Sequence, residues 1–226
     1  MQTDVVIPAL DEEASVGEVV SALDRRLVRD VIVVDNGSRD ATALRAAAAG
    51  ARVVVEPRRG YGQACLAGLA ALRPGCEVVV FLDADGSDAP GELSSLVEPI
   101  ADGHADLVVG SRRVVELGAL TPQQRVGNAI AALWLRRRYG LAATDLGPFR
   151  AIRLRALLAL GMTDRTYGWT VEMQIRAARA GLRYQERPVT YRRRVGRSKI
   201  SGTLRGTLGA SARILSLLAR HDLLRP

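Results

Sequence analysis

The sequence contains few residues that could support redox or histidine-based chemistry. Among its 226 residues are two cysteines and two histidines. Cys65 and Cys76 do not form a C-x-x-C pair, so we expect them to be small buried hydrophobic side chains in a reducing compartment. His104 and His221 lie far apart in polar surroundings, which excludes an obvious Ser-His-acid triad built on either residue.

Long apolar runs are also absent. None reaches the ~20 residues that a membrane-spanning helix needs, and Asp4 begins a strand-like run where a signal peptide would need a basic patch and an apolar core. Hydrophobic residues still make up 48% of the chain, which supports a sizeable core and argues against disorder. We therefore expect one soluble, cytoplasmic domain over residues 1–226, without linkers or internal repeats.

Lysine is almost missing from a basic chain. Of 32 basic residues, 31 are arginine, and Lys199 is the single lysine. A compact ammonium and a planar guanidinium are not interchangeable at a tight phosphate site. Lys199 is therefore either a specific phosphate contact or a chance exception in an arginine-rich composition.

Charge is divided unevenly along the chain. Residues 1–110 contain 9 Arg and 18 Asp or Glu, a net charge of −9, whereas residues 111–226 contain 23 Lys or Arg and 6 Asp or Glu, a net charge of +17. Together the halves give the formal net charge of +8. This division favours a cation site that faces a polyanion site, and the alternative is two solvated charged faces.

The first half of the chain alternates short apolar runs with amphipathic segments. We predict strands at 4–9, 31–35, 52–56, 78–83 and 106–112, and helices at 12–27, from the Asp40 cap to near Gly50, at about 63–72 and after Pro90. Continuous apolar strands separated by helices are typical of an α/β fold, with a mostly parallel sheet covered on both faces.

The second half is less regular. We predict a helix at 122–139 with Val126, Ile130 and Leu133 on one face, a short strand at 147–153, a helix at 169–181 and a partly exposed edge strand at 183–194. Arg136, Arg137 and Arg138 are expected to form a solvated helix end. A basic loop at 195–202 precedes a last helix at 203–220.

Acidic side chains follow three of the predicted strands. They are Asp11, Glu13, Asp35, Asp83 and Asp85, and ligands of open parallel sheets gather at this edge. Single acids in such places are usually helix caps or turn formers. Asp83 and Asp85 can converge on one hard divalent cation, which prefers carboxylate and phosphate oxygens. A Mg²⁺ or Mn²⁺ ion carrying a pyrophosphate is therefore the predicted positive partner of these acids.

The segments VVIPALDEE, VIVVDNGSRD, RRGYGQA, VVFLDADGSD and GSRR resemble, in this order and spacing, the inverting family 2 glycosyltransferases of GT-A fold. DLGPFRAIR, YGWTVEMQIRAA and RPVTYRRRVGRSKISG are similar to the dolichyl- or polyprenyl-phosphate sugar synthases within that family. The resemblance covers nearly the whole chain. It implies a nucleotide-binding half at 1–110 and an acceptor-binding half at 111–226.

The resemblance also implies roles for individual residues. It places nucleotide-sugar contacts at Pro8, Ala9, Asp11, Glu13, Asp35, Asn36, Gly62, Asp83, Ala84, Asp85, Arg194 and Lys199, with the metal on Asp83 and Asp85. Arg112 and Arg125 would receive the phosphate of the acceptor, and with Asp85 they form the expected catalytic set. Arg194 and Lys199 would close over the donor diphosphate. Two departures from the family pattern are Ser87 in place of a glutamine and Asn36 in place of an acid.

The acceptor decides whether the reaction needs a base. A phosphate monoester, with a second pKa of about 6, is already nucleophilic near pH 7, whereas a hydroxyl would need a carboxylate base. Asp85, Asp145 and Glu172 are the candidates for that base. The positive charge after residue 110 favours a polyprenyl phosphate, and the alternative is a hydroxyl of a soluble small molecule or saccharide.

Two other classes of function are considered. A nucleic-acid-binding protein would explain the pI near 10.4 but not the acidic edge, so we expect no nucleic-acid partner. A nucleotidyltransferase would also place a metal and a nucleotide at the ends of strands, but it leaves the DLGPFR and RVGRSKI segments unexplained.

The final helix offers one route to a lipid acceptor. Leu204, Leu208, Leu215 and Leu218 share one face of a helical wheel, with Arg213 and Arg220 nearly opposite. This leucine stripe either packs on the sheet of the domain or lies at a bilayer surface, where it would form a peripheral contact on the cytoplasmic face.

Overall fold

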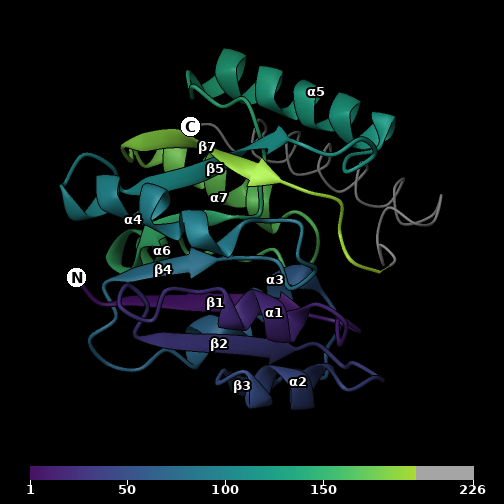
Figure 1. Ribbon diagram of the computed structural model, residues 1–226. Helices are drawn as coiled ribbons and strands as arrows, with labels where there is room; N and C mark the ends of the chain where they lie inside the picture. Colours follow the sequence, from purple (N-terminus) through teal and green to yellow (C-terminus); the bar gives the residue numbers. More distant parts are fainter. Residues whose placement is uncertain (197–226) are drawn as a thin grey trace.

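The computed structural model describes residues 1–196, and they form a seven-stranded sheet covered by helices (Figure 1). The strands are β1 (Thr3–Ala9), β2 (Asp30–Asp35), β3 (Arg52–Val55), β4 (Val78–Phe81), β5 (Leu107–Val114), β6 (Arg150–Arg153) and β7 (Tyr184–Tyr191). Their order across the sheet is β3-β2-β1-β4-β6-β5-β7. The predicted last helix at 203–220 and Lys199 lie outside the described residues.

All of these strands except β6 run in one direction. β1 is parallel to β2 and β4, β2 is parallel to β3, and β7 is parallel to β5. β6 is antiparallel to both β4 and β5, which leaves β5 parallel to β4. The carboxyl ends of the parallel strands therefore meet at one edge of the sheet, as the sequence predicts.

Helices cover both faces of the sheet. They are α1 (Val16–Ser21), α2 (Thr42–Ala48), α3 (Tyr61–Ala70), the 3-10 helix η1 (Pro90–Glu92), α4 (Leu93–Ala101), α5 (Pro122–Tyr139), α6 (Leu154–Leu160) and α7 (Trp169–Arg179). Helices α1, α2 and α4 lie on one face of the sheet, and α3, α6 and α7 lie on the other (Figure 1). Side chains of the first three helices join one core cluster, and those of the second three join another.

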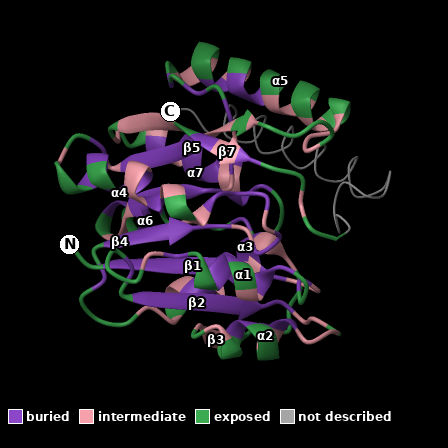
Figure 2. Ribbon diagram, in the orientation of Figure 1, coloured by how far each residue is buried: buried purple, intermediate pink, exposed green. Residues whose placement is uncertain are grey.

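The central strands are buried on both faces because their side chains alternate between these two clusters. On β1, Val5 and Ile7 pack into the first cluster and Val6 into the second, and all three are fully buried. Figure 2 shows β1, β2 and β4 as buried strands. Each such side chain contributes about 1.5–3 kcal/mol to folding. Cys65 and Cys76 are buried and unpaired, as expected of small hydrophobic side chains.

Helix α5 lies outside these two layers and packs on α7. Thr121 and Gln124 form a capping box at its start, and Gly140 in the left-handed conformation ends it. Leu135 packs against Val171 and Ile175 of α7. The helix predicted at 122–139 is therefore confirmed, but its Val126, Ile130 and Leu133 face is exposed to solvent.

The predicted strands are confirmed, with boundaries that differ by three residues or fewer. The helix predicted at 12–27 was too long, because only Val16–Ser21 is helical. The chain turns beforehand, where Ser15 N donates to Glu12 O (3.1 Å), and Asp24 afterwards accepts from Arg26 N (2.9 Å). The cap of α2 was assigned one residue early, since Ala41 rather than Asp40 precedes it. Helix α6 follows β6 directly and was not predicted.

Candidate functional site

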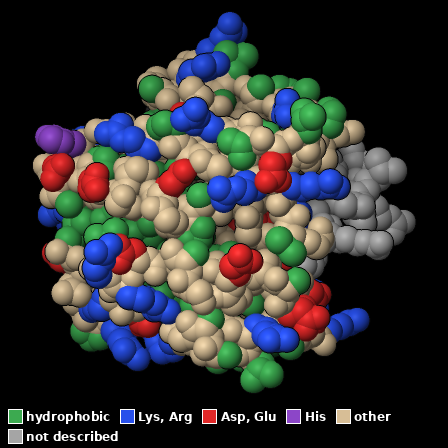
Figure 3. Space-filling model, viewed as in Figure 1, with side chains coloured by type: hydrophobic (Ala, Val, Ile, Leu, Met, Phe, Trp, Pro, Cys, Tyr) green, Lys and Arg blue, Asp and Glu red, His purple; other side chains and the backbone are tan. Residues whose placement is uncertain are grey.

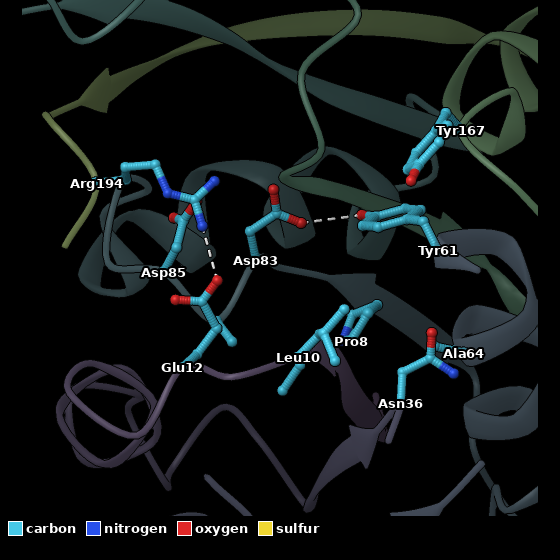
Figure 4. Close-up of a pocket in the computed structure, with 12 residues that line it drawn as sticks. Pro8, Leu10, Glu12, Asn36, Tyr61, Ala64, Asp83, Asp85, Tyr167 and Arg194 are labelled. Atoms are coloured by element: carbon cyan, nitrogen blue, oxygen red, sulfur yellow. Dashed lines mark hydrogen bonds and ion pairs between the residues drawn. The ribbon is translucent and has the colours of Figure 1, made fainter. Parts of the chain in front are cut away.

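A cavity opens beyond the carboxyl ends of β1, β2 and β4, at the edge where the sequence predicts a site (Figure 4). It is lined by Pro8, Ala9, Leu10, Glu12, Asn36, Tyr61, Ala64, Asp83, Ala84, Asp85, Tyr167 and Arg194. The structure thus brings together seven of the predicted nucleotide-sugar contacts: Pro8, Ala9, Asn36, Asp83, Ala84, Asp85 and Arg194.

The two acids of the D-x-D motif lie in a turn, because β4 ends at Phe81. Ser87 closes this turn by two hydrogen bonds. Its backbone N (2.9 Å) and its Oγ (2.6 Å) both donate to Asp85 Oδ1. The hydroxyl of Tyr61 donates to Asp83 Oδ1 (3.1 Å; Figure 4). Burial, with the nearby Asp85 charge, raises the pKa of Asp83 to about 7. The site therefore holds more negative charge than its surroundings compensate.

The positive group nearest to these acids, among the described residues, is the guanidinium of Arg194. Its Nη1 lies 3.2 Å from Asp85 Oδ2, and its Nη2 donates to Glu12 Oε1 (2.7 Å; Figure 4). The segment that carries it is fixed on the turn by two backbone bonds, from Arg192 N to Ser87 O (2.8 Å) and from Val195 N to Asp85 O (2.9 Å). Arg192 and Arg193 are exposed, so Arg194 is the inward member of this arginine run.

The carboxylates of this turn are suitable ligands for a divalent metal that is bound by few protein groups. In the described part of the chain, no group of three or more His, Cys, Asp or Glu side chains is arranged for metal binding. Asp83 and Asp85 are two carboxylates that line the same cavity, and the raised pKa of Asp83 reflects charge that a cation would relieve. Mg²⁺ is typically held by one or two carboxylates together with substrate phosphates and water.

Three of the predicted acids do not line the cavity. Their carboxylates instead support the loop after β2: Asp11 accepts from Arg39 N (2.7 Å), Glu13 from Ala41 N (3.0 Å) and Asp35 from Ser38 N (2.9 Å). Asp11 has a positive φ of 51° and turns the chain at this point. Contact of these three acids with a nucleotide remains a prediction.

Asn36 connects the end of β2 to the loop before α3. Its Nδ2 donates to Glu56 O (2.9 Å) and Arg58 O (2.8 Å), and its Oδ1 accepts from Gly60 N (2.8 Å). An aspartate could not donate these two bonds, so the departure from the family pattern has a structural role here.

Gly62 packs against the loop before α7. Its N donates to Thr166 O (3.1 Å), and an added Cβ would lie 2.0 Å from Asp164 O. Glycine is therefore required at this position for close packing, and its contact with a nucleotide sugar remains a prediction.

Arg112 and Arg125 line a second cavity, together with Val114, Val115, Glu116, Leu117 and Leu120. Arg112 donates from Nε and Nη2 to Asp145 (2.8 and 2.6 Å), and its guanidinium lies over the ring of Tyr191, 5.2 Å from the centroid. Burial alone would raise the pKa of Asp145, but the hydrogen bonds and charge of Arg112 outweigh burial and the pKa is lowered. Arg125 is exposed at the start of α5.

Two of the three candidate bases are occupied by structural contacts. Asp145 is paired with Arg112. Glu172 is buried and accepts from Thr163 N (3.1 Å), Asp164 N (2.7 Å) and Arg176 Nε (2.8 Å). Neither carboxylate lines the cavities of the predicted site, so Asp85 is the candidate base that remains at the site.

The sequence prediction missed one acidic residue of the cavity wall. Glu12 lines the cavity, although its neighbours Asp11 and Glu13 do not. Tyr61 and Tyr167 also line it, whereas Trp169 is a core residue in edge contact with Phe81. The sequence left open whether these aromatic residues contact a ligand or pack in the core, and the only sequence signal for Glu12 was its place in a run of three acids.

Comparisons with known proteins point to one enzyme family. The family model described as Glycosyl transferase family 2 matches residues 4–160. The uncharacterized glycosyltransferase Rv0539 of Mycobacterium tuberculosis is 46% identical, covering 90% of this chain and 92% of its own length. The undecaprenyl-phosphate mannosyltransferase of Micrococcus luteus is 35% identical, covering 100% and 98%.

Among solved structures, glucosyl-3-phosphoglycerate synthase from Mycobacterium tuberculosis, in complex with Mn²⁺, UDP and glucosyl-3-phosphoglycerate, has a TM-score of 0.77 and is 26% identical. The match covers 100% of this chain and 81% of that chain.

Proposed function

Because the chain belongs to glycosyltransferase family 2, whose model matches residues 4–160, we propose that it transfers a sugar from a nucleotide diphosphate donor to a polyprenyl phosphate, with inversion at the anomeric carbon. Its fold is GT-A-like, as expected, with a mostly parallel sheet and helices around it. The proposal assigns the donor to the cavity beside Asp83 and Asp85 and the acceptor to the cavity beside Arg112 and Arg125.

The donor side is built to hold a diphosphate. Asp83 and Asp85 would hold the Mg²⁺ or Mn²⁺ ion, which as a Lewis acid would stabilise the charge of the leaving diphosphate. Arg194 lies beside Asp85 and can donate to the same diphosphate oxygens. Tyr61 orients Asp83, and Ser87 orients Asp85. Preorganised groups of this kind stabilise developing charge without a reorganisation cost.

The observation that carries the acceptor assignment is the lining of the second cavity. Two arginines, Arg112 and Arg125, share it with four apolar side chains, Val114, Val115, Leu117 and Leu120. An arginine pair suits a phosphate group, since the guanidinium fork matches its oxygens. Apolar side chains beside this pair suit the first isoprenyl units of a lipid.

The pairing of the carboxylate beside Arg112 is consistent with the same acceptor. Asp145, the acid closest to Arg112, is held by that arginine, and the pKa of Asp145 is lowered. A phosphate monoester is largely dianionic near pH 7, since its second pKa is about 6, and attacks without losing a proton to the enzyme. A hydroxyl acceptor would need a general base within hydrogen-bond reach.

The surface next to this cavity supports docking at a bilayer. Val126, Ile130 and Leu133 form an exposed apolar face on α5, 41–59% accessible, and Leu117 in the preceding loop is 98% accessible. Figure 3 shows hydrophobic and basic side chains together along α5, at the top of this view. Exposed apolar side chains with arginines beside them suit contact with a bilayer surface.

The test is a transfer assay with defined acceptors. Purified protein is incubated with UDP- or GDP-sugars and Mg²⁺ or Mn²⁺, and with either a polyprenyl phosphate or the matching polyprenol. Product masses are then read. We expect a hexose adduct of the polyprenyl phosphate alone, lost in Asp85→Asn. An adduct of the polyprenol would contradict the proposal.

A second candidate is a soluble acceptor that carries a phosphate. The likeness to glucosyl-3-phosphoglycerate synthase favours it, and Arg112 and Arg125 could bind such a group equally well. A soluble acceptor, however, would give no role to the apolar lining of the second cavity or to the exposed apolar face of α5. Adding 3-phosphoglycerate as a third acceptor in the same assay separates the two candidates.

A further inference from the structure

Glu12 has a fixed position at the mouth of the donor cavity. It is 8% exposed and lies in the turn between β1 and α1. Its backbone N donates to Thr42 Oγ1 (2.8 Å), and its carbonyl accepts from Ser15 N (3.1 Å). Ser15 in turn donates from Oγ to Ala84 O (2.8 Å), inside the D-x-D motif. Glu12 is therefore anchored to the same turn that carries Asp83 and Asp85.

The side chain of Glu12 shares one guanidinium with Asp85. Arg194 Nη2 donates to Glu12 Oε1 (2.7 Å), while Arg194 Nη1 lies 3.2 Å from Asp85 Oδ2 (Figure 4). Arg194 Nε is buried and has no hydrogen-bond acceptor among the described residues. A buried donor without an acceptor is uncommon and calls for a ligand atom. An anionic oxygen of a bound ligand would supply such an acceptor.

A divalent metal on Asp85 and the present position of Arg194 are in competition. A metal held by Asp83 and Asp85 would compete with Arg194 Nη1 for the carboxylate of Asp85. Two cations a few ångströms apart in a site of low dielectric constant repel each other strongly. Arg194 would leave Asp85 when the metal binds, but its bond to Glu12 does not depend on Asp85.

We infer that Glu12 is a positioning residue for Arg194. Before the metal binds, Glu12 and Asp85 hold the guanidinium between them. After the metal takes Asp85, Glu12 retains Arg194 at the rim, where Nε and the released Nη1 can donate to the diphosphate of the donor. This inference rests on the proposed function only in assuming a metal and a nucleotide diphosphate, and it is independent of the acceptor.

The first test measures Mn²⁺ binding without donor, by electron paramagnetic resonance of the free ion. Arg194→Gln removes the competing cation, so we expect Mn²⁺ to bind about tenfold more tightly. In Glu12→Gln, Arg194 loses its contact with the Glu12 carboxylate and would pair more tightly with Asp85. Mn²⁺ would then compete less well for Asp85, so it should bind several-fold more weakly. Glu98→Gln removes the same charge from an exposed position on α4 and should leave Mn²⁺ affinity unchanged.

The second test measures steady-state kinetics with saturating Mn²⁺. If Glu12 acts through Arg194, Glu12→Gln should lower kcat nearly as much as Arg194→Gln does, and the double variant should be no slower than Arg194→Gln alone. A merely structural role for Glu12 would make the two losses additive. Far-ultraviolet circular dichroism confirms that each variant is folded.

Equal or weaker Mn²⁺ binding in Arg194→Gln would overturn the inference, even if Glu12→Gln fails to fold. Additive losses of kcat would also overturn it. A wrong acceptor assignment would give a different result. Mn²⁺ would still bind and still respond to Arg194→Gln, but no polyprenyl phosphate would be glycosylated.

Discussion

At the scale of single residues, the acidic turn after β4 governs the chemistry. Burial and Asp85 raise the pKa of Asp83 from 3.8 to about 7. The folded protein therefore holds this proton more tightly than the unfolded chain, and the carboxyl destabilises the metal-free fold as the pH rises from 3.8 towards 7. A metal that binds the carboxylate competes with that proton.

Mn²⁺ affinity should consequently depend on pH. Between pH 6 and pH 8 we expect it to rise about tenfold, because Asp83 loses its proton over this range. Tyr61→Phe removes a hydrogen bond that favours the carboxylate, so the rise should move to higher pH. Titrations monitored by electron paramagnetic resonance at several pH values test both points. A flat profile in the parent protein would contradict the assignment of Asp83.

Single residues also show where sequence reasoning stopped. Asp83, Asp85 and Asn36 were found because each follows a strand of a parallel sheet. Glu12 was missed because three consecutive acids are equivalent in sequence, and the positive φ of Asp11 decides which of them enters the cavity. Aspartate adopts a positive φ more often than most residues, but its presence alone does not predict a backbone reversal. The role expected for Lys199 remains a prediction.

At the scale of elements, the contact of α3 with the loop before α7 shapes one wall of the donor cavity. Gly62→Ala should lower the free energy of unfolding by about 1–3 kcal/mol, because the new Cβ would meet Asp164 O at 2.0 Å. Gly127→Ala, in α5, meets no atom within 4 Å and should instead stabilise the helix by up to about 1 kcal/mol. Urea unfolding measures both, and equal effects would refute the packing argument.

A charged contact joins the residues that immediately precede β5 and β7 at the edge of the sheet. Asp106 accepts from Arg183 Nε (2.9 Å) and Nη2 (2.8 Å), and mainly for this reason its pKa is lowered to about 2. The folded carboxyl has the lower pKa, so its stabilisation is present above 3.8 and is lost as the pH falls towards 2.

Asp106→Asn should therefore lower the free energy of unfolding by about 1 kcal/mol at pH 7, an amount reduced by the exposure of Arg183. The difference from the parent should vanish near pH 2. Asp102→Asn, at an exposed position nearby, should have little effect at either pH. Unfolding curves at both pH values give the comparison, and a difference that persists at the lower pH would contradict the assignment.

Most elements could be predicted, because the residues that pack into the two core clusters recur as apolar residues at regular spacing in the sequence. Strands β1, β2 and β4 are continuous apolar runs, since they are buried on both faces. The antiparallel direction of β6 could not be predicted, because a short strand of this composition would be buried in the same way in either direction. Helix α6 was missed since it follows β6 without a turn signal.

At the scale of the whole molecule, the exposed apolar face of α5 belongs to the basic half of the sequence, residues 111–226. In the described residues, no helix is long and apolar enough to cross a membrane. Separately, the proposed acceptor is a membrane lipid, so the proposed function implies contact with a bilayer surface. Acidic and basic side chains are interspersed on the rest of the face in Figure 3, which suits solvated surface.

Replacing Ile130 and Leu133 with glutamine should weaken binding to anionic liposomes, because both side chains would lose apolar burial in the bilayer. Added salt should weaken binding of the parent, since basic residues near an anionic surface contribute about 1 kcal/mol each. Leu158→Gln, on α6 and 65% exposed, is the matched control.

Liposome cosedimentation measures all three proteins. Undiminished binding of the α5 variant would contradict this docking surface. Truncation after Gly202 would then test the predicted helix at 203–220, which lies outside the described residues.

The linkage formed in the product tests the central claim most directly. The protein is incubated with Mn²⁺, the donor sugar and a short polyprenyl phosphate, and the product is examined by phosphorus and proton nuclear magnetic resonance. The account predicts that the phosphate becomes a diester to the sugar, with the anomeric configuration opposite to that of the donor. A product that retains a phosphate monoester and carries the sugar on a hydroxyl oxygen would contradict it.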